Sequence, residues 1–141
     1  MRYLPAGLLA AFLLAAPLSA QEEPAPSAQD WQALESRAQG MFDLLKMQNS
    51  ELAASSLFEG VGEDTTEKIA QFSEQLDTMI ESDGPLLGCE VVSRNNFGSY
   101  MAKLVYVCQH ARDVAVWTLT YEKPGRGWQI TNVTFTTSYE Y

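Results

Sequence analysis

The sequence predicts an α+β fold in which three N-terminal helices pack on a curved four-stranded antiparallel meander, giving a cone-like domain. From about residue 31 to residue 83, apolar residues recur every three or four positions, which is the period of an amphipathic helix. After Pro85 the composition shifts to Val, Thr, Tyr and Trp, interrupted by short turn sequences, which is typical of strands joined by hairpins. Helices followed by strands favour a sheet with helices on one face.

The chain begins with a segment that is typical of a secretory signal peptide. Arg2 precedes the apolar run LPAGLLAAFLLAAPL, and small residues lead to an expected cleavage site between Ala20 and Gln21. Pro5 and Pro17 bracket a shorter apolar run within it, which falls below the ~20 apolar residues that a transmembrane helix needs. We therefore expect residues 1–20 to be removed on export to the periplasm or the extracellular space of a bacterium, with no membrane anchor in the mature chain.

The remainder has the length of one domain. Residues 21–29 are rich in Pro, Glu, Ala and Gln and are expected to form a disordered tether, followed by a single α+β domain at residues 30–141. The formal net charge is −9, and it falls by one further unit when the signal is removed, because the signal contains one Arg and no acidic residue. Such an acidic surface repels phosphate groups, so nucleic acid is not an expected partner.

Two helices are expected to precede the first glycine-rich break. The first carries apolar residues at three- and four-residue spacing from Trp31 to Leu45, and Asp30 is placed to cap its start. The second is a brief helix that begins near Ser50 and ends at Gly60, since glycine readily adopts left-handed backbone.

A third helix is expected after this break. Asp64 and Glu67 have the spacing of a capping pair at its start. Gly84 and Pro85 are expected to end it, because proline cannot continue a helix. Its charged residues match a solvated helix face and no catalytic pattern.

Two cysteines predict the register of the first hairpin. Strands are expected at about residues 86–93, 100–110, 113–122 and 127–137. Placing the first turn at Gly98 and Ser99 puts Cys89 and Cys108 directly opposite each other. Opposite residues of an antiparallel pair have Cα atoms about 4.5 Å apart when they are not hydrogen-bonded, which a disulfide accepts. Because an exported protein passes through an oxidising compartment, we expect a disulfide between them.

The same register leaves both faces of the sheet substantially apolar, so cover or curvature is expected on the second face. In the last strand the apolar positions change parity between Ile130 and Val133, which predicts a β-bulge near Thr131 and Asn132. The residues expected to line the core or a pocket beneath the helices are Leu104, Trp117, Trp128, Ile130 and Phe135.

The order of elements and the closing pattern Gly-Trp-x-Ile-x-x-Val-x-Phe at residues 127–135 resemble the nuclear transport factor 2-like group, also called SnoaL-like or ketosteroid-isomerase-like. The resemblance covers about residues 30–138 and implies a strongly curved sheet wrapped around the helices as a cone. The chain departs from the group in two respects. The segment LFEGVGE leaves little room for the strand or hairpin that members usually carry before the third helix, and no Asp lies within a predicted strand interior, where enzymes of the group place their base.

Two functions from different classes fit these residues. The first is a non-enzymatic exported domain that binds an apolar small ligand or a protein partner, with a basic protein or a second copy in a homodimer among the candidates. The second is an isomerase-like or cyclase-like enzyme in which His110 is the general base and Tyr106 or Tyr100 donates to an oxyanion. The absence of a catalytic motif favours the first function.

No cofactor is expected, and no metal. The chain contains two cysteines and one histidine, whereas a zinc site takes three or four ligands.

Overall fold

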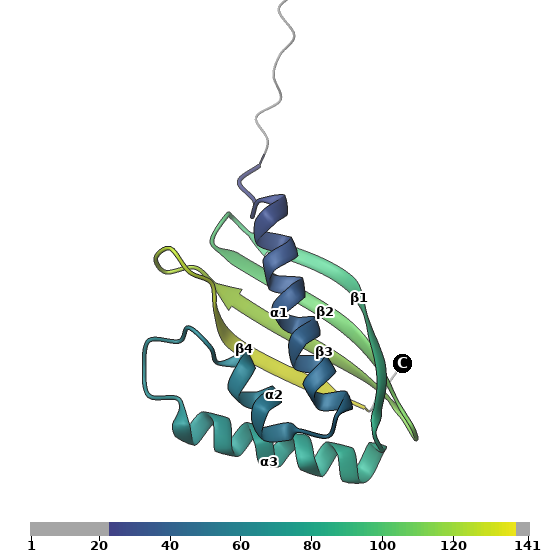
Figure 1. The fold of residues 1–141 in the computed structure, drawn as a ribbon. Coiled ribbons are helices and arrows are strands. Elements are labelled where there is room, and N and C mark those ends of the chain that lie inside the picture. Colours follow the sequence, from purple (N-terminus) through teal and green to yellow (C-terminus); the bar gives the residue numbers. More distant parts are fainter. Residues whose placement is uncertain (1–22, 138–141) are drawn as a thin grey trace, which may run out of the picture.

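Three helices cover one face of a four-stranded antiparallel sheet (Figure 1). The computed structural model describes residues 23–137, so the predicted signal peptide lies outside the described residues. The elements are α1 (Ala28–Lys46), α2 (Ser50–Leu57), α3 (Thr66–Asp83), β1 (Leu86–Phe97), β2 (Met101–His110), β3 (Val114–Glu122) and β4 (Gln129–Thr136). The strands pair in chain order, which makes β1 and β4 the two edges of an open sheet. The predicted α+β class is confirmed.

The start of α1 is fixed by a capping box. The N–H of Asp30 donates to the Ser27 hydroxyl oxygen at 3.0 Å, and the N–H of Ser27 donates to a carboxylate oxygen of Asp30, also at 3.0 Å. Asp30 is therefore the third residue of the helix. The prediction that Asp30 is the N-cap is wrong, because Ser27 takes that position. Residues 28 and 29, which were assigned to the tether, belong to the helix.

The start of α3 differs from the prediction, whereas its end agrees. Asp64 forms no capping pair with Glu67; its Oδ1 accepts from the N–H of Thr66 at 3.0 Å and from the Thr66 hydroxyl at 2.7 Å. This is a local turn of the kind that Asp side chains favour. α3 ends at Gly84, whose φ of +87° suits glycine, and a Cβ at this position would lie 2.9 Å from the Cβ of Ala111.

The predicted register at the cysteines is confirmed. Cys89 pairs with Cys108 across β1 and β2, their Cα atoms are 4.0 Å apart, and their sulfur atoms form a disulfide. The turn itself comprises residues 98–100 and is one residue longer than predicted. A β-bulge at Val92 absorbs the additional residue between the turn and the disulfide.

The β-bulge predicted in the last strand is present. Thr120 of β3 pairs with Asn132 and the next residue, Tyr121, pairs with Ile130, so Thr131 is the extra residue. In a regular strand, residues three positions apart point to opposite faces. The bulge allows Ile130 and Val133 to face the helices together.

The inner face of the sheet buries a cluster of aromatic rings against the helices. Trp117 of β3 lies at its centre with no exposed surface. Its ring meets Phe42 of α1 edge-on at a centroid distance of 5.4 Å and stacks on Phe135 of β4 at 4.7 Å. Phe42 also meets Tyr106 of β2 at 5.0 Å. The predicted core residues Leu104, Trp117 and Ile130 are buried here.

The outer face of the sheet carries no helix among the described residues (Figure 1). The expected cover of this second apolar face is therefore not provided by a helix. Its central residues Val105, Val107 and Val116 are half-buried by their neighbours in the sheet. Val92 and Val114 are exposed.

A polar network ties the start of α1 to the loop between β3 and β4. The indole N–H of Trp128 donates to Asp30 Oδ1 at 3.0 Å, and the ammonium group of Lys123 lies 3.7 Å from the same oxygen. Arg37 donates to the Trp128 carbonyl oxygen at 2.7 Å. The hydrogen bond from Trp128, followed by the one from the Ser27 N–H, lowers the pKa of Asp30.

We predict that Asp30→Asn lowers the free energy of unfolding by about 1 kcal/mol at neutral pH, because it weakens charge-assisted hydrogen bonds. Since the folded-state pKa of Asp30 is below its unfolded value, the contribution is complete above about pH 4 and is lost as the pH falls through the folded-state pKa. Urea titrations from neutral to acidic pH should show the difference from wild type shrinking. Asp77→Asn, on the exposed side of α3, is the matched control, and a difference independent of pH contradicts this role.

We also predict that replacing both cysteines by serine lowers the free energy of unfolding by roughly 2–4 kcal/mol, because the disulfide closes a loop in the unfolded chain. Cys89 and Cys108 are 19 positions apart. Thermal and urea unfolding of the double variant measures the loss. Reduction of the wild-type protein should reproduce it, and an unchanged unfolding midpoint after reduction would show that the bond does not constrain the fold.

Candidate functional site

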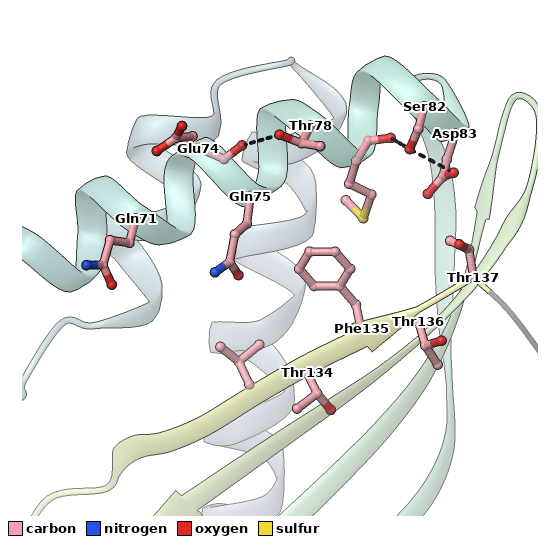
Figure 2. Close-up of a pocket in the computed structure, with 12 residues that line it drawn as sticks. Gln71, Glu74, Gln75, Thr78, Ser82, Asp83, Thr134, Phe135, Thr136 and Thr137 are labelled. Carbon is pink, nitrogen blue, oxygen red and sulfur yellow. Dashed lines mark hydrogen bonds between the residues drawn. The ribbon is translucent and has the colours of Figure 1, made fainter.

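An open groove with a volume of about 850 Å³ runs between α3 and the edge strand β4 (Figure 2). Its floor is apolar and consists of Met79 from α3 with Val133 and Phe135 from β4. Figure 2 shows the Phe135 ring in the space between the helix and the strand, with the Gln75 side chain directed toward the strand. The groove therefore combines an apolar base with polar walls.

A second hollow of about 520 Å³ continues the first toward the start of β4. Gln71, Gln75 and Val133 line both hollows, so the two are contiguous. Further apolar lining comes from Phe58, Val61, Phe72 and Ile130. Together the hollows are lined by every residue of β4, so the trough follows the full length of this sheet edge; we call it the α3–β4 groove.

The groove exists because α3 stands off from β4. The main helix packing of α3 is with α2, and its buried side chains reach the core through Phe72 and Leu76. Phe72 meets the Phe135 ring edge-on at a centroid distance of 6.4 Å. Val133 and Phe135 face α3 but remain only partly buried. An edge strand that faces a helix without closing against it leaves apolar surface accessible.

The exposed face of α3 beside the groove is acidic, and of its charged residues Glu74 and Lys68 line the groove itself. The exposed charged residues of α3 are Glu67, Glu74, Asp77 and Glu81, with Lys68 as the cation. Asp83, at the end of the helix and of the groove, is only 7% exposed. Its carboxylate accepts from the Ser82 hydroxyl at 3.0 Å, and no ammonium or guanidinium group of the described residues lies within ion-pair distance.

The histidine considered as a catalytic base lies in the core. His110 is 3% exposed at the end of β2. Its Nδ1 lies 2.9 Å from the carbonyl oxygen of Gly84, to which the Nδ1–H tautomer donates. Its Nε2 is buried and has no hydrogen-bond partner in the described part of the chain. His110 lines neither the α3–β4 groove nor the surface hollows beside Leu52 and Met101.

The structure does not bring the two candidate tyrosines to one site. Tyr106 is buried against Phe42, and burial raises its pKa far above the ordinary range. Tyr100 is 66% exposed in the turn before β2. It therefore lies at the opposite end of the strand from His110, about 30 Å away at 3.3 Å per residue. His110 and Tyr106 share the inner face, about 13 Å apart along the strand by the same spacing.

The remaining residues expected in a core or pocket lie in different places. Phe135 is on the groove floor, whereas Trp128 is half-buried in the loop before β4 and bonded to Asp30. The sequence does not predict the α3 side of the groove. Met79 belongs by its spacing to the buried apolar stripe of the helix, and Gln75 belongs to the face expected to contact solvent. The signal available in the sequence is that residues 129–137 carry no charge, which is unusual for an exposed edge strand.

Residues 23–137 contain neither a cluster of metal-ligating side chains nor a membrane-spanning helix. No group of three or more His, Cys, Asp or Glu side chains is arranged to hold a metal ion. None of the three helices combines the length and hydropathy needed to cross a membrane.

The structure defines a small α+β domain with three helices on one face of an open sheet and an apolar-floored groove along one sheet edge, beside an acidic helix face. Comparison with models of protein families, with curated proteins and with solved structures yields no match. The resemblance to the nuclear transport factor 2-like group therefore stays a prediction.

Alkaline pH should test the burial of the inner face. Burial raises the pKa of Tyr121 to about 12, opposed by the Arg37 guanidinium 5.6 Å from its ring centre, and the hydroxyl has no hydrogen-bond partner in the described residues. Because the folded-state pKa is raised, stability is complete below the ordinary value of 10.0 and is lost as the pH rises toward 12. We predict that Tyr121→Phe is at least as stable as wild type at neutral pH and loses less stability in this range. Urea unfolding with tyrosinate absorbance measures both, and equal alkaline losses contradict the prediction.

Proposed function

We propose that the protein is an exported, non-enzymatic domain that binds a segment of another protein in the α3–β4 groove. The observation that carries this proposal is the contrast between a filled interior and an open edge. The interior between the helices and the sheet is filled by side chains that are fully buried, among them Leu34, Phe42, Leu104 and Trp117. Phe135, in contrast, is only partly buried and remains accessible on the groove floor.

Export is supported by two independent features. The N-terminal sequence has the charge, apolar run and small residues of a secretory signal. The Cys89–Cys108 disulfide is of a kind that persists in oxidising compartments and is rare in the cytosol. We propose that the mature chain acts in the periplasm or outside the cell.

The shape of the groove favours a polypeptide over a small apolar ligand. Small-molecule sites enclose most of the ligand surface. The α3–β4 groove is open and follows the whole of β4, so it offers contact along a line and not around a compact molecule. The enzymatic alternative gains no support, because His110, Tyr106 and Tyr100 share no groove.

Selection of random peptides displayed on phage, followed by amide chemical-shift mapping, tests the proposal. Enriched peptides should bind the mature chain and perturb amides of α3 and β4. Gln75→Trp, which places a large side chain at the junction of the two hollows, should weaken binding by at least about tenfold, or about 1.4 kcal/mol.

Gln39→Trp, at an exposed site on α1, is the matched control and should bind as wild type does. Amide chemical-shift perturbations that map to another surface, or that are unchanged in Gln75→Trp, would contradict the proposal. If no peptide is enriched and an apolar dye such as Nile red binds tightly within the core, the proposal is wrong and binding of an apolar small ligand is favoured instead.

A further inference from the structure

The two edges of the sheet differ in how they are protected against pairing. Along β1 lie two bulges and the charged side chains of Glu90 and Arg94, and Asn96 donates to the carbonyl oxygen of Pro24 at 3.3 Å. Natural sheets use such bulges, charges and covering segments to prevent strand addition. β4 carries no charged residue, and its only bulge is at Thr131. The stretch from Asn132 to Phe135 is therefore the regular, uncharged part of a sheet edge.

The groove lies where an added strand would run. A strand beside β4 would lie beneath α3, with every second side chain facing the apolar floor formed by Met79, Val133 and Phe135. A segment as long as β4 spans about 27 Å at 3.3–3.4 Å per residue. Strand addition of this kind derives affinity from main-chain hydrogen bonds and specificity from pockets for alternate side chains.

Asp83 adds a charge requirement at one end of the groove. Asp83 as a whole residue is only 7% exposed, and its carboxylate has a single hydroxyl partner among the described residues. Arg112, whose backbone N–H donates to the Asp83 carbonyl oxygen at 2.8 Å, is already engaged, because its guanidinium donates to the carbonyl oxygens of Glu81 at 2.7 Å and Ser82 at 3.2 Å. A buried carboxylate gains most from a cationic partner that brings its own hydrogen bonds. Figure 2 shows Asp83 at the end of the groove near Thr137.

We infer that the segment bound in the α3–β4 groove is an extended strand that pairs with the edge of β4 and carries a Lys or Arg whose side chain binds Asp83. The inference rests on the proposed function and narrows it to a partner chemistry: alternating apolar residues with a basic residue at one end. The acidic exposed face of α3 favours the same basic partners through long-range attraction.

Random octapeptides selected on the mature chain (residues 21–141) test this inference. Enriched sequences should show apolar residues at alternate positions and Lys or Arg near one terminus. Affinities of the synthetic consensus peptide are measured by fluorescence anisotropy at low and high salt. Asp83→Asn should weaken binding by about tenfold and reduce its salt dependence, whereas Asp77→Asn should change it by less than about twofold.

Two peptide-side changes keep the test independent of the folding of Asp83→Asn. Replacing the basic residue by norleucine should weaken binding to wild type as much as Asp83→Asn does. N-methylation of alternate amides should abolish binding for one set and spare the other, because a strand pairs with one neighbour through alternate residues. Equal effects of the two N-methylated sets overturn the strand geometry.

The remaining outcomes separate the two proposals. Peptides that lose affinity in Gln75→Trp but show no basic preference overturn the inference and leave the proposed function standing. Failure of every selected peptide to respond to Gln75→Trp rejects the proposed function itself. If the wild-type protein sediments as a dimer and Gln75→Trp dissociates it, the groove is occupied by a second copy. If deletion of residues 138–141 raises the affinity for peptide by more than about tenfold, the groove is occupied by those residues. Either result overturns the inference.

Discussion

The packing around Trp117 determines how the helices sit on the sheet. Its ring lies at the centre of the inner face and contacts Phe42 from α1, Phe72 from α3 and Phe135 from β4. Aromatic side chains bury about 150–250 Å² each, so this cluster dominates the apolar area that the small core removes from water. α1 lies over the middle of the sheet through Phe42, whereas α3 lies toward the β4 edge, where its Phe72 contacts both Trp117 and Phe135.

The groove is a consequence of that arrangement. Because Phe72 touches both Trp117 and Phe135 edge-on, α3 is held beside β4 without closing on it. The same density leaves Trp117 Nε1 and the Tyr121 hydroxyl without hydrogen-bond partners in the described residues. Such buried polar atoms cost about 1–3 kcal/mol each. The disulfide and the Asp30 network stabilise the fold against this cost, and the disulfide lies between β1 and β2, on the side of the sheet away from β4.

The sequence predicts the elements of this fold better than their relative placement. Helix periodicity, the cysteine pairing and the parity change before Val133 are local patterns, and each corresponds to a feature of the structure. The turn is one residue longer than predicted. The bulge at Val92 restores the predicted register before the disulfide, and no local pattern in the sequence marks that bulge. Asp30 and Asp64 have capping chemistry, but several residues nearby compete for each role.

The candidate site escaped sequence reasoning for a different reason. It is formed by two elements, α3 and β4, whose closest residues are more than forty positions apart in the chain. Phe135 belongs to the core by its apolar character, and only its place on an edge strand under a helix held at a distance leaves it accessible. The lack of charge in residues 129–137 is visible in the sequence, but it acquires meaning only when β4 is known to be an edge.

A preformed edge and floor determine where the energetic cost of binding falls. The protein already holds β4 in register through β3 and Phe135 through Trp117, so little of its own chain must be ordered. The cost therefore falls on the partner, at about 1–2 kcal/mol for each backbone residue that becomes fixed. Main-chain hydrogen bonds offset part of this cost, since their net worth is about 1 kcal/mol each. The remaining affinity comes from the apolar side chains that reach Val133 and Phe135 and from the cation that meets Asp83. Strand pairing is available to any sequence, so the apolar floor and Asp83 determine which partners are selected.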